Sequence, residues 1–160
     1  MEAEKSRRMV TNKLLFKLYL MRSLPMGFIA GLSVSEFTAE KCSIAVPYKW
    51  LNQNPFNSTY FAVLAMAAEM SSGMVAMMHT RNSKPSISML VTGIEAEFVK
   101  KATGLTIFTC ESGDEILRVI ESCITTGEGK TIRCPAIGRS KSGEVVAKFI
   151  ITWSFKARTK

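Results

Sequence analysis

A single carboxylate, that of Glu69, lies in the most apolar part of the chain. It is the only formally charged residue between positions 50 and 80, where Ala, Met, Ser, Gly and aromatic residues predominate. Burial in such surroundings raises the pKa of a carboxyl group, and a raised pKa suits a group that transfers protons. A carboxylate can activate water as a general base or attack as a nucleophile. We therefore expect Glu69 to be catalytic or to contact a ligand; the alternative is a structural acid bonded to Ser72 or to backbone.

The residues around Glu69 predict a long central helix. Residues 58–79 lack Pro and are rich in helix formers, and Asn57 or Ser58 can serve as the N-cap. The stripe of this helix that contains Glu69 otherwise carries small residues, which are Ala62, Ala65, Ser72 and Ala76. Small side chains allow a ligand or a partner backbone to approach closely, so Glu69 is expected to face a crevice or a second subunit.

The same helix carries a run of methionines. Flexible methionine side chains either fill gaps in a core or line an adaptable acyl pocket. The run comprises Met66, Met70, Met74, Met77 and Met78.

Strand-like segments flank the central helix in the sequence. Alternating apolar and β-branched residues predict strands over 31–37, 41–46, 94–99, 105–110, 130–139 and 144–157. Consecutive strands are expected to pair as hairpins, with turns near residues 38–40, 101–104 and 140–143. Pro135 suggests a bulge or an edge in the fifth strand. A helix over 111–126 completes an α+β domain, in which one antiparallel sheet wraps the central helix.

Residues 1–24 predict an amphipathic helix that ends before Pro25. Its apolar positions, interspersed with Lys and Arg, are Val10, Leu14, Phe16, Leu18 and Met21. We expect this face to cover one end of the core; a basic amphipathic helix could instead lie on a membrane surface.

Length and composition indicate one globular domain over residues 1–160, with 47% apolar and 21% charged residues. The net charge of +8 favours anionic partners, but no nucleic-acid-binding motif accompanies it, so no nucleic-acid partner is expected. The central helix is long enough to cross a bilayer, yet a charge near its centre opposes insertion. We therefore expect no integral membrane association.

The cysteines and the single histidine indicate a protein without a metal. Four cysteines lack any C-x-x-C spacing, and one histidine cannot complete a zinc site with them. The N-terminus does not resemble a secretory signal, so a cytoplasmic location with reduced thiols is expected.

The segment from 54 to 69 reads N-P-F-N-S-T-Y-F-A-V-L-A-M-A-A-E, and together with the predicted architecture it resembles the hotdog-fold thioesterases. It looks most like an uncharacterised branch related to the phenylacetyl-CoA thioesterase type, and the resemblance covers nearly the whole chain. In that type an Asn is followed after three residues by Gly, after three more by His-Gly-Gly, and nine residues beyond the His by Asp or Glu. The corresponding positions here are Asn54, Asn57, Tyr60, Phe61, Ala62 and Glu69. Only Asn54 and Glu69 keep the family's residue types.

The resemblance implies a homodimer, with tetramers left open, in which two sheets join edge to edge and each site lies between subunits. The acid of one central helix would face the start of the partner's helix, whose N–H groups can bind a thioester carbonyl. The implied substrate is an acyl-CoA or an acylated carrier protein, without a cofactor or a metal.

Glu69 is thus the predicted catalytic residue. The predicted substrate-binding residues are Asn54, Asn57, Tyr60, Phe61, Ala62 and Ser72. Asn54 could instead only shape its loop, because Asn-Pro is a turn former. The alternative function is a hotdog protein that holds an acyl or aromatic ligand without turning it over.

Overall fold

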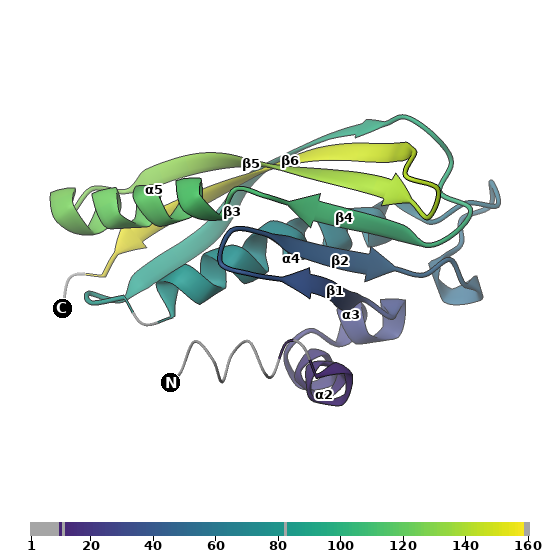
Figure 1. Cartoon of the computed structure of the whole chain (residues 1–160), viewed down its shortest axis with the longest axis horizontal. Helices are drawn as coiled ribbons and strands as arrows, with labels where there is room; N and C mark the ends of the chain where they lie inside the picture. The colour runs from purple at the N-terminus through teal and green to yellow at the C-terminus, as the bar shows by residue number, and fades with distance from the viewer. Residues whose placement is uncertain (1–9, 11, 82, 159–160) are drawn as a thin grey trace.

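Six antiparallel strands form one sheet that wraps around one long helix (Figure 1). The computed structural model describes residue 10, residues 12–81 and residues 83–158. The strands lie in the order β1-β2-β4-β5-β6-β3. Their bounds are Ser33–Phe37 (β1), Cys42–Val46 (β2), Ile87–Phe98 (β3), Thr106–Cys110 (β4), Lys130–Ser140 (β5) and Val145–Ala157 (β6). The predicted α+β architecture is confirmed.

The central helix α4 (Phe61–Thr80) supplies much of the core. It packs against β2, β4, β5 and β6, and residues such as Ala67, Ala68 and Val75 have no exposed surface. α4 is long and apolar enough to cross a membrane, but most of it is buried inside the fold, as the core helix of a soluble domain is.

The start of α4 differs from the prediction. The helix begins at Phe61 with Tyr60 at the N-cap, and no side chain caps it. Asn57 and Ser58 belong to the preceding loop instead: Oδ1 of Asn54 accepts hydrogen bonds from the N–H (3.2 Å) and the hydroxyl (3.1 Å) of Ser58. Asn57 has a left-handed backbone, with φ 57°. The predicted N-cap was wrong: the hydroxyl of Ser58 bonds within the loop, and Asn57 lies three residues before the N-cap position. The first N–H groups of α4 therefore have no side-chain acceptor.

β3 pairs with β6, and the predicted hairpin between residues 94–99 and 105–110 was wrong. β3 begins at Ile87 and lies antiparallel alongside β6, whereas β4 pairs with β2 and β5. The connection after β3 crosses the start of α4, where the N–H and the hydroxyl of Thr59 donate to the carbonyl oxygen of Ala102 (2.7 and 3.1 Å). β6 has 13 residues and β4 has 5, so β3 can form more backbone hydrogen bonds with β6 than with β4. β3 is therefore an edge strand.

The other two hairpins, β1–β2 and β5–β6, are confirmed. Pro135 lies on β5 beyond the ladder with β4, which reaches only residues 137–140 of β5. β5 therefore has a strand partner on one side only at Pro135, which agrees with the predicted edge. The helix α5 (Gly113–Thr126), predicted over 111–126, packs against β5 and β6.

Two helices are described at the N-terminal end, α2 (Lys13–Ser23) and α3 (Pro25–Ala30). Of the predicted helix over residues 1–24, residues 1–9 and 11 lie outside the described residues. Pro25 begins α3, because Pro fits the first turn of a helix. The predicted apolar face was wrong in part: Val10 and Phe16 are buried, whereas Leu14, Leu18 and Met21 are exposed.

Candidate functional site

Glu69 lies near the middle of α4 and lines a small apolar cavity of about 190 Å³. The walls of this cavity include Tyr19 from α2, Met74 from α4, Met89 from β3 and Trp153 from β6. No hydrogen bond or ion pair from the described residues reaches the Glu69 carboxylate, and burial raises its pKa. Glu69 therefore has the surroundings of a proton-transferring group, not those of an acid satisfied by its neighbours.

Ser72 supports Glu69 from within the core. Its hydroxyl donates to the backbone carbonyl oxygen of Glu69 (3.0 Å) and accepts a hydrogen bond from Nε1 of Trp153 (2.9 Å). Ser72 has no exposed surface, so a substrate cannot reach its hydroxyl in this structure. The predicted substrate contact by Ser72 is not supported, because the residue lies beneath the cavity.

Gly73 keeps space open beside the carboxylate. A Cβ atom at this position would lie 3.3 Å from Oε1 of Glu69 and 3.1 Å from Cζ2 of Trp153. A side chain here would therefore press on the carboxylate, because the Trp153 ring is buried and fixed by its hydrogen bond.

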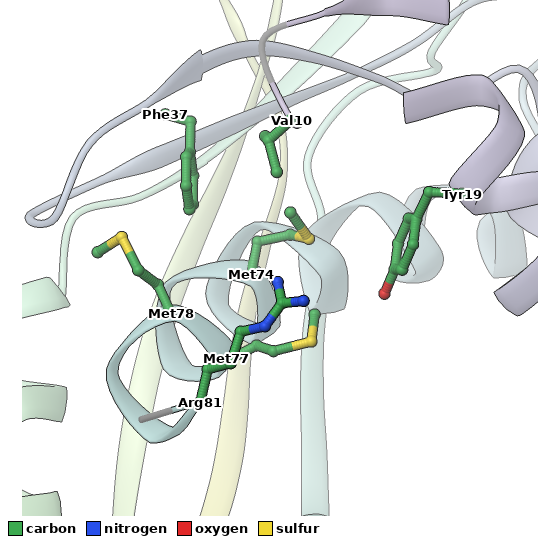
Figure 2. Close-up of a pocket in the computed structure, with 7 residues that line it drawn as sticks. All are labelled: Val10, Tyr19, Phe37, Met74, Met77, Met78 and Arg81. Carbon is green, nitrogen blue, oxygen red and sulfur yellow. The ribbon is translucent and has the colours of Figure 1, made fainter. Parts of the chain in front are cut away.

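A second cavity, of about 290 Å³, continues from the first toward the end of α4. Tyr19, Met74 and Met77 line both cavities. Figure 2 shows Met74, Met77 and Met78 extending from α4 into the space bounded by Val10, Phe37 and Tyr19. Most of these walls are apolar and adaptable, and the side chain of Arg81 also lines the second cavity. The two adjoining cavities can accept a hydrocarbon chain whose reactive end lies at Glu69.

The start of α4 lines a third cavity, of about 540 Å³. Tyr60 and Phe61 face it with exposed rings that meet edge to face at 4.8 Å, and Asn54 also lines it. The N–H groups of Phe61 and Ala62, the first two of the helix, have no acceptor among the described residues. Free N–H groups at the positive end of a helix can bind a carbonyl oxygen.

The two asparagines before α4 shape its entry loop. Oδ1 of Asn54 accepts hydrogen bonds from the N–H groups of Phe56 (3.0 Å) and Ser58 (3.2 Å), so its side chain already acts as a turn former. Asn57 is exposed and, like Ala62, does not line the third cavity.

Glu69 and the start of its own helix are too far apart to act on one thioester. Tyr60 and Glu69 are nine positions apart, which corresponds to about 13 Å at 1.5 Å per residue of helix. One chain therefore does not bring Glu69 together with Tyr60, Phe61 and Ala62. A site that uses both ends requires a second copy.

The free edge of β3 offers a surface for such a copy. Ile94 and Phe98 lie opposite Ile151 and Ala147 of β6, so they belong to the inner face of the sheet. Both are nevertheless exposed, because α4 packs against β2, β4, β5 and β6. In the part of the chain that the structure describes, β3 has β6 as its one strand partner. An uncovered apolar face beside an unpaired strand edge is typical of an interface.

The sequence did not indicate Tyr19, Met89 and Trp153 as neighbours of Glu69. Each has the residue type of an ordinary core position, and only the tertiary fold brings three separate elements around the carboxylate. The methionine run was the usable signal, because Met70, Met74 and Met77 line the Glu69 cavity. Among residues 10, 12–81 and 83–158, no group of three or more His, Cys, Asp or Glu side chains could hold a metal.

Comparison with known proteins identifies the fold. The structure is similar to a Pseudomonas aeruginosa protein of unknown function described as a probable thioesterase, with a TM-score of 0.78 and 17% identity over 89% of this chain and 95% of that one. It is also similar to a Haemophilus influenzae thioesterase, with a TM-score of 0.67 and 11% identity over 93% of each chain. A mutant thioesterase of P. aeruginosa gives a TM-score of 0.70 at 11% identity over 92% of this chain and 95% of that one. The fold is therefore the predicted hotdog fold of thioesterases.

The sequence comparisons identify the family. No curated protein matches the sequence. A family model matches residues 12–155, which is most of the chain. The chain therefore belongs to the family described as a domain of unknown function, DUF4442.

Proposed function

We propose that this protein hydrolyses thioesters of coenzyme A or of an acylated carrier protein, in a site shared by two copies of the chain. The observation that carries the proposal is the carboxylate of Glu69, which is largely buried, has no bonding partner among the described residues and lines an apolar cavity. The fold shared with thioesterases supports the same class of reaction.

A homodimer built on the β3 edges supplies both halves of the site. A two-fold axis at this edge relates the two α4 helices, so the start of one helix can lie near the middle of the other. Pairing the edges would also cover Ile94 and Phe98. A further pairing of dimers into tetramers stays a prediction.

The proposed reaction uses both halves of the shared site together. The N–H groups of Phe61 and Ala62 in one protomer bind the thioester carbonyl oxygen, and Glu69 of the other protomer faces the carbonyl carbon. Glu69 accepts a proton from water while the water oxygen bonds to that carbon, and the N–H groups stabilise the resulting oxyanion. The carbon–sulfur bond then breaks, and the thiolate takes the proton from Glu69. The products are a free thiol and a carboxylic acid.

The acyl chain of the substrate is proposed to occupy the two methionine-lined cavities. These cavities extend from Glu69 past Met74 and Met77 to Met78, and Met78 lies nine positions after Glu69 in α4. That distance is about 13 Å. Three backbone bonds of an extended chain span about 3.4 Å, so a hydrocarbon of about twelve carbons would span this distance. Medium-chain acyl thioesters are therefore the proposed substrates.

The second candidate function is ligand binding without turnover. It is favoured by one observation: Phe61 presents an exposed ring at the start of α4. The thioesterase type that the sequence resembles has glycine at this position. If that ring crowds the carbonyl site, the protein would hold acyl ligands in the same cavities and release them unchanged.

A hydrolysis assay with a matched variant tests the proposal. Wild-type protein is incubated with acyl-CoA esters from acetyl to dodecanoyl, and free thiol is measured. The glutamine variant Glu69→Gln should lower kcat by about 100-fold or more, because general base catalysis contributes at least that factor. Glu121→Gln, which changes an exposed carboxylate on α5, serves as the control and should retain the wild-type rate.

Two results would reject hydrolysis. One is the absence of thiol release above background with every ester. The other is an equal rate in Glu69→Gln and wild type. Tight, chain-length-dependent binding of the esters without thiol release would establish the binding function instead.

A further inference from the structure

The outer side of α2 is apolar although it faces solvent. At 3.6 residues per turn, Leu14, Leu18 and Met21 fall within about 60° of one another around the helix. Phe16 and Leu20, which are buried, lie on the opposite side. The core therefore accounts for one apolar face of α2 and leaves the second without a function in the fold.

Basic residues flank this second face. Lys17 and Arg22 lie on either side of the stripe formed by Leu14, Leu18 and Met21, and both are exposed. Residues 10–35 and 46–68 contain no Asp or Glu, so no acidic side chain of these segments neutralises the charge.

Exposed apolar residues also lie on the elements next to α2. α3 packs on α2 and presents Met26 and Ile29 to solvent. The short helix η1 (Trp50–Asn52) contacts α3, and the amide of Asn52 donates to the carbonyl oxygen of Ala30 at 2.9 Å. Trp50 of η1 is 82% exposed. We call this the α2–η1 surface; its residues are Leu14, Leu18, Met21, Met26, Ile29 and Trp50.

We infer that the α2–η1 surface docks the protein on an anionic lipid bilayer. Apolar side chains flanked by Lys and Arg suit the boundary of a bilayer, where the apolar groups enter the acyl region and the cations meet phosphate headgroups. The exposed Trp50 on η1 suits the boundary of a bilayer as well, because its ring is amphipathic. A second copy of this chain fits less well, since a two-fold contact would bring Lys17 and Arg22 against the same cations.

Vesicle binding by the full-length protein tests this inference. The probes are vesicles of phosphatidylcholine and phosphatidylglycerol in equal parts, with pure phosphatidylcholine vesicles for comparison. The protein should sediment with the anionic vesicles and at least tenfold less with the neutral ones. Raising the salt from about 0.1 M to about 1 M shortens the screening length from about 10 Å to about 3 Å and should weaken binding.

The two tryptophans of the chain give a second readout. Trp50 is exposed and Trp153 is 5% exposed, so a shift of the emission to shorter wavelength on adding anionic vesicles reports Trp50. The shift should vanish in Trp50→Phe.

A matched pair of leucines provides the decisive variants. Leu14→Gln combined with Leu18→Gln should weaken vesicle binding about tenfold or more, because two apolar side chains no longer enter the bilayer. Leu90→Gln should bind as the wild type does, because Leu90 is equally exposed (65% against 68% for Leu14) but lies on the outer face of β3.

Three results would overturn the inference. The first is that the wild type fails to sediment with anionic vesicles. The second is an equal loss of binding in Leu90→Gln. The third is a lower mass of the Leu14→Gln, Leu18→Gln variant in sedimentation equilibrium without lipid, which would assign the surface to contacts between copies.

Discussion

Nε1 of Trp153 donates a hydrogen bond of 2.9 Å to the hydroxyl of Ser72, and this contact joins β6 to α4 directly behind Glu69. Both side chains are buried. Because Ser72 also donates to the carbonyl oxygen of Glu69, the contact fixes the Trp153 ring that forms one wall of the Glu69 cavity.

Removing the Ser72 hydroxyl should destabilise the fold and disturb the site. Ser72→Ala leaves the indole N–H of Trp153 buried without an acceptor, which costs about 1–3 kcal/mol. Urea unfolding should show this loss, and thioester hydrolysis should fall as well. Ser71→Ala is the matched control, because Ser71 is equally buried and its hydroxyl bonds only to a carbonyl of its own helix, that of Ala68. Equal stabilities of the two variants would show that the Trp153 contact has no such role.

Stability and activity should depend on the protonation of Glu69 in opposite ways. Burial raises the pKa of Glu69 above its ordinary value of 4.5. At a pH between 4.5 and this raised pKa, the folded chain therefore holds a proton that the unfolded chain has released. The free energy of unfolding therefore falls as the pH rises through this window. Glu69→Gln should be more stable than wild type above the window, and the difference should shrink as the pH falls toward the ordinary carboxyl pKa.

The rate of thioester hydrolysis should change with pH in the opposite direction, because the ionised carboxylate of Glu69 acts as the base. In wild type kcat/KM should rise with pH through the raised pKa. Urea unfolding and initial rates over a pH series check both slopes. A Glu69→Gln variant that is less stable than wild type at high pH would contradict this assignment.

Filling the far end of the methionine-lined cavities should change the preferred chain length. Met78 lines the second cavity but not the Glu69 cavity. Met78→Trp places a larger side chain there, so the ratio of kcat/KM for dodecanoyl-CoA to that for butyryl-CoA should fall about tenfold or more, each excluded CH2 contributing about 0.8 kcal/mol. An unchanged ratio would place the acyl chain elsewhere without affecting the role of Glu69.

A carboxylate at the start of α4 should raise stability and lower activity together. Tyr60 is the N-cap and provides no side-chain acceptor, so Tyr60→Asp can cap the free N–H groups and stabilise the fold by about 1 kcal/mol. The same Asp competes with the thioester oxygen for these donors, and kcat should fall about 100-fold. Tyr60→Phe removes only the hydroxyl and is the control. If Tyr60→Asp raises the melting temperature without slowing hydrolysis, the N–H groups do not bind the substrate.

The sequence predicted the parts of the fold that follow from local periodicity. The alternation along residues 144–157 identified β6, and the apolar run around Glu69 identified α4. The predicted pairing of β3 with β4 was wrong. Proximity in the sequence favours a hairpin, but β3 pairs instead with the longer apolar strand β6, whose partner residues lie 49 to 70 positions further along the chain. The exposed face of α2 was misassigned for a related reason, since both of its sides are apolar and composition cannot say which one is buried.

The candidate site was predictable only in part. A lone charge in an apolar helix identified Glu69, and the run of methionines on the same helix was recognised as a possible acyl pocket. The walls contributed by Tyr19, Met89 and Trp153 depend on tertiary packing and left no local signal. The start of α4 was placed too early, because Ser58, a predicted N-cap, donates its N–H and hydroxyl to Asn54 within the loop instead of capping the helix.

Mixing two inactive variants tests most directly whether one site uses Glu69 of one copy and the helix start of the other. Glu69→Gln and Tyr60→Asp are unfolded together, refolded in equal amounts and assayed for thiol release. In a two-fold dimer, half of the random pairs are mixed and each mixed pair has one intact site, so about a quarter of the wild-type activity should return. If the mixture is no more active than the separate variants, while wild type refolded in the same way regains its activity, the shared site is contradicted.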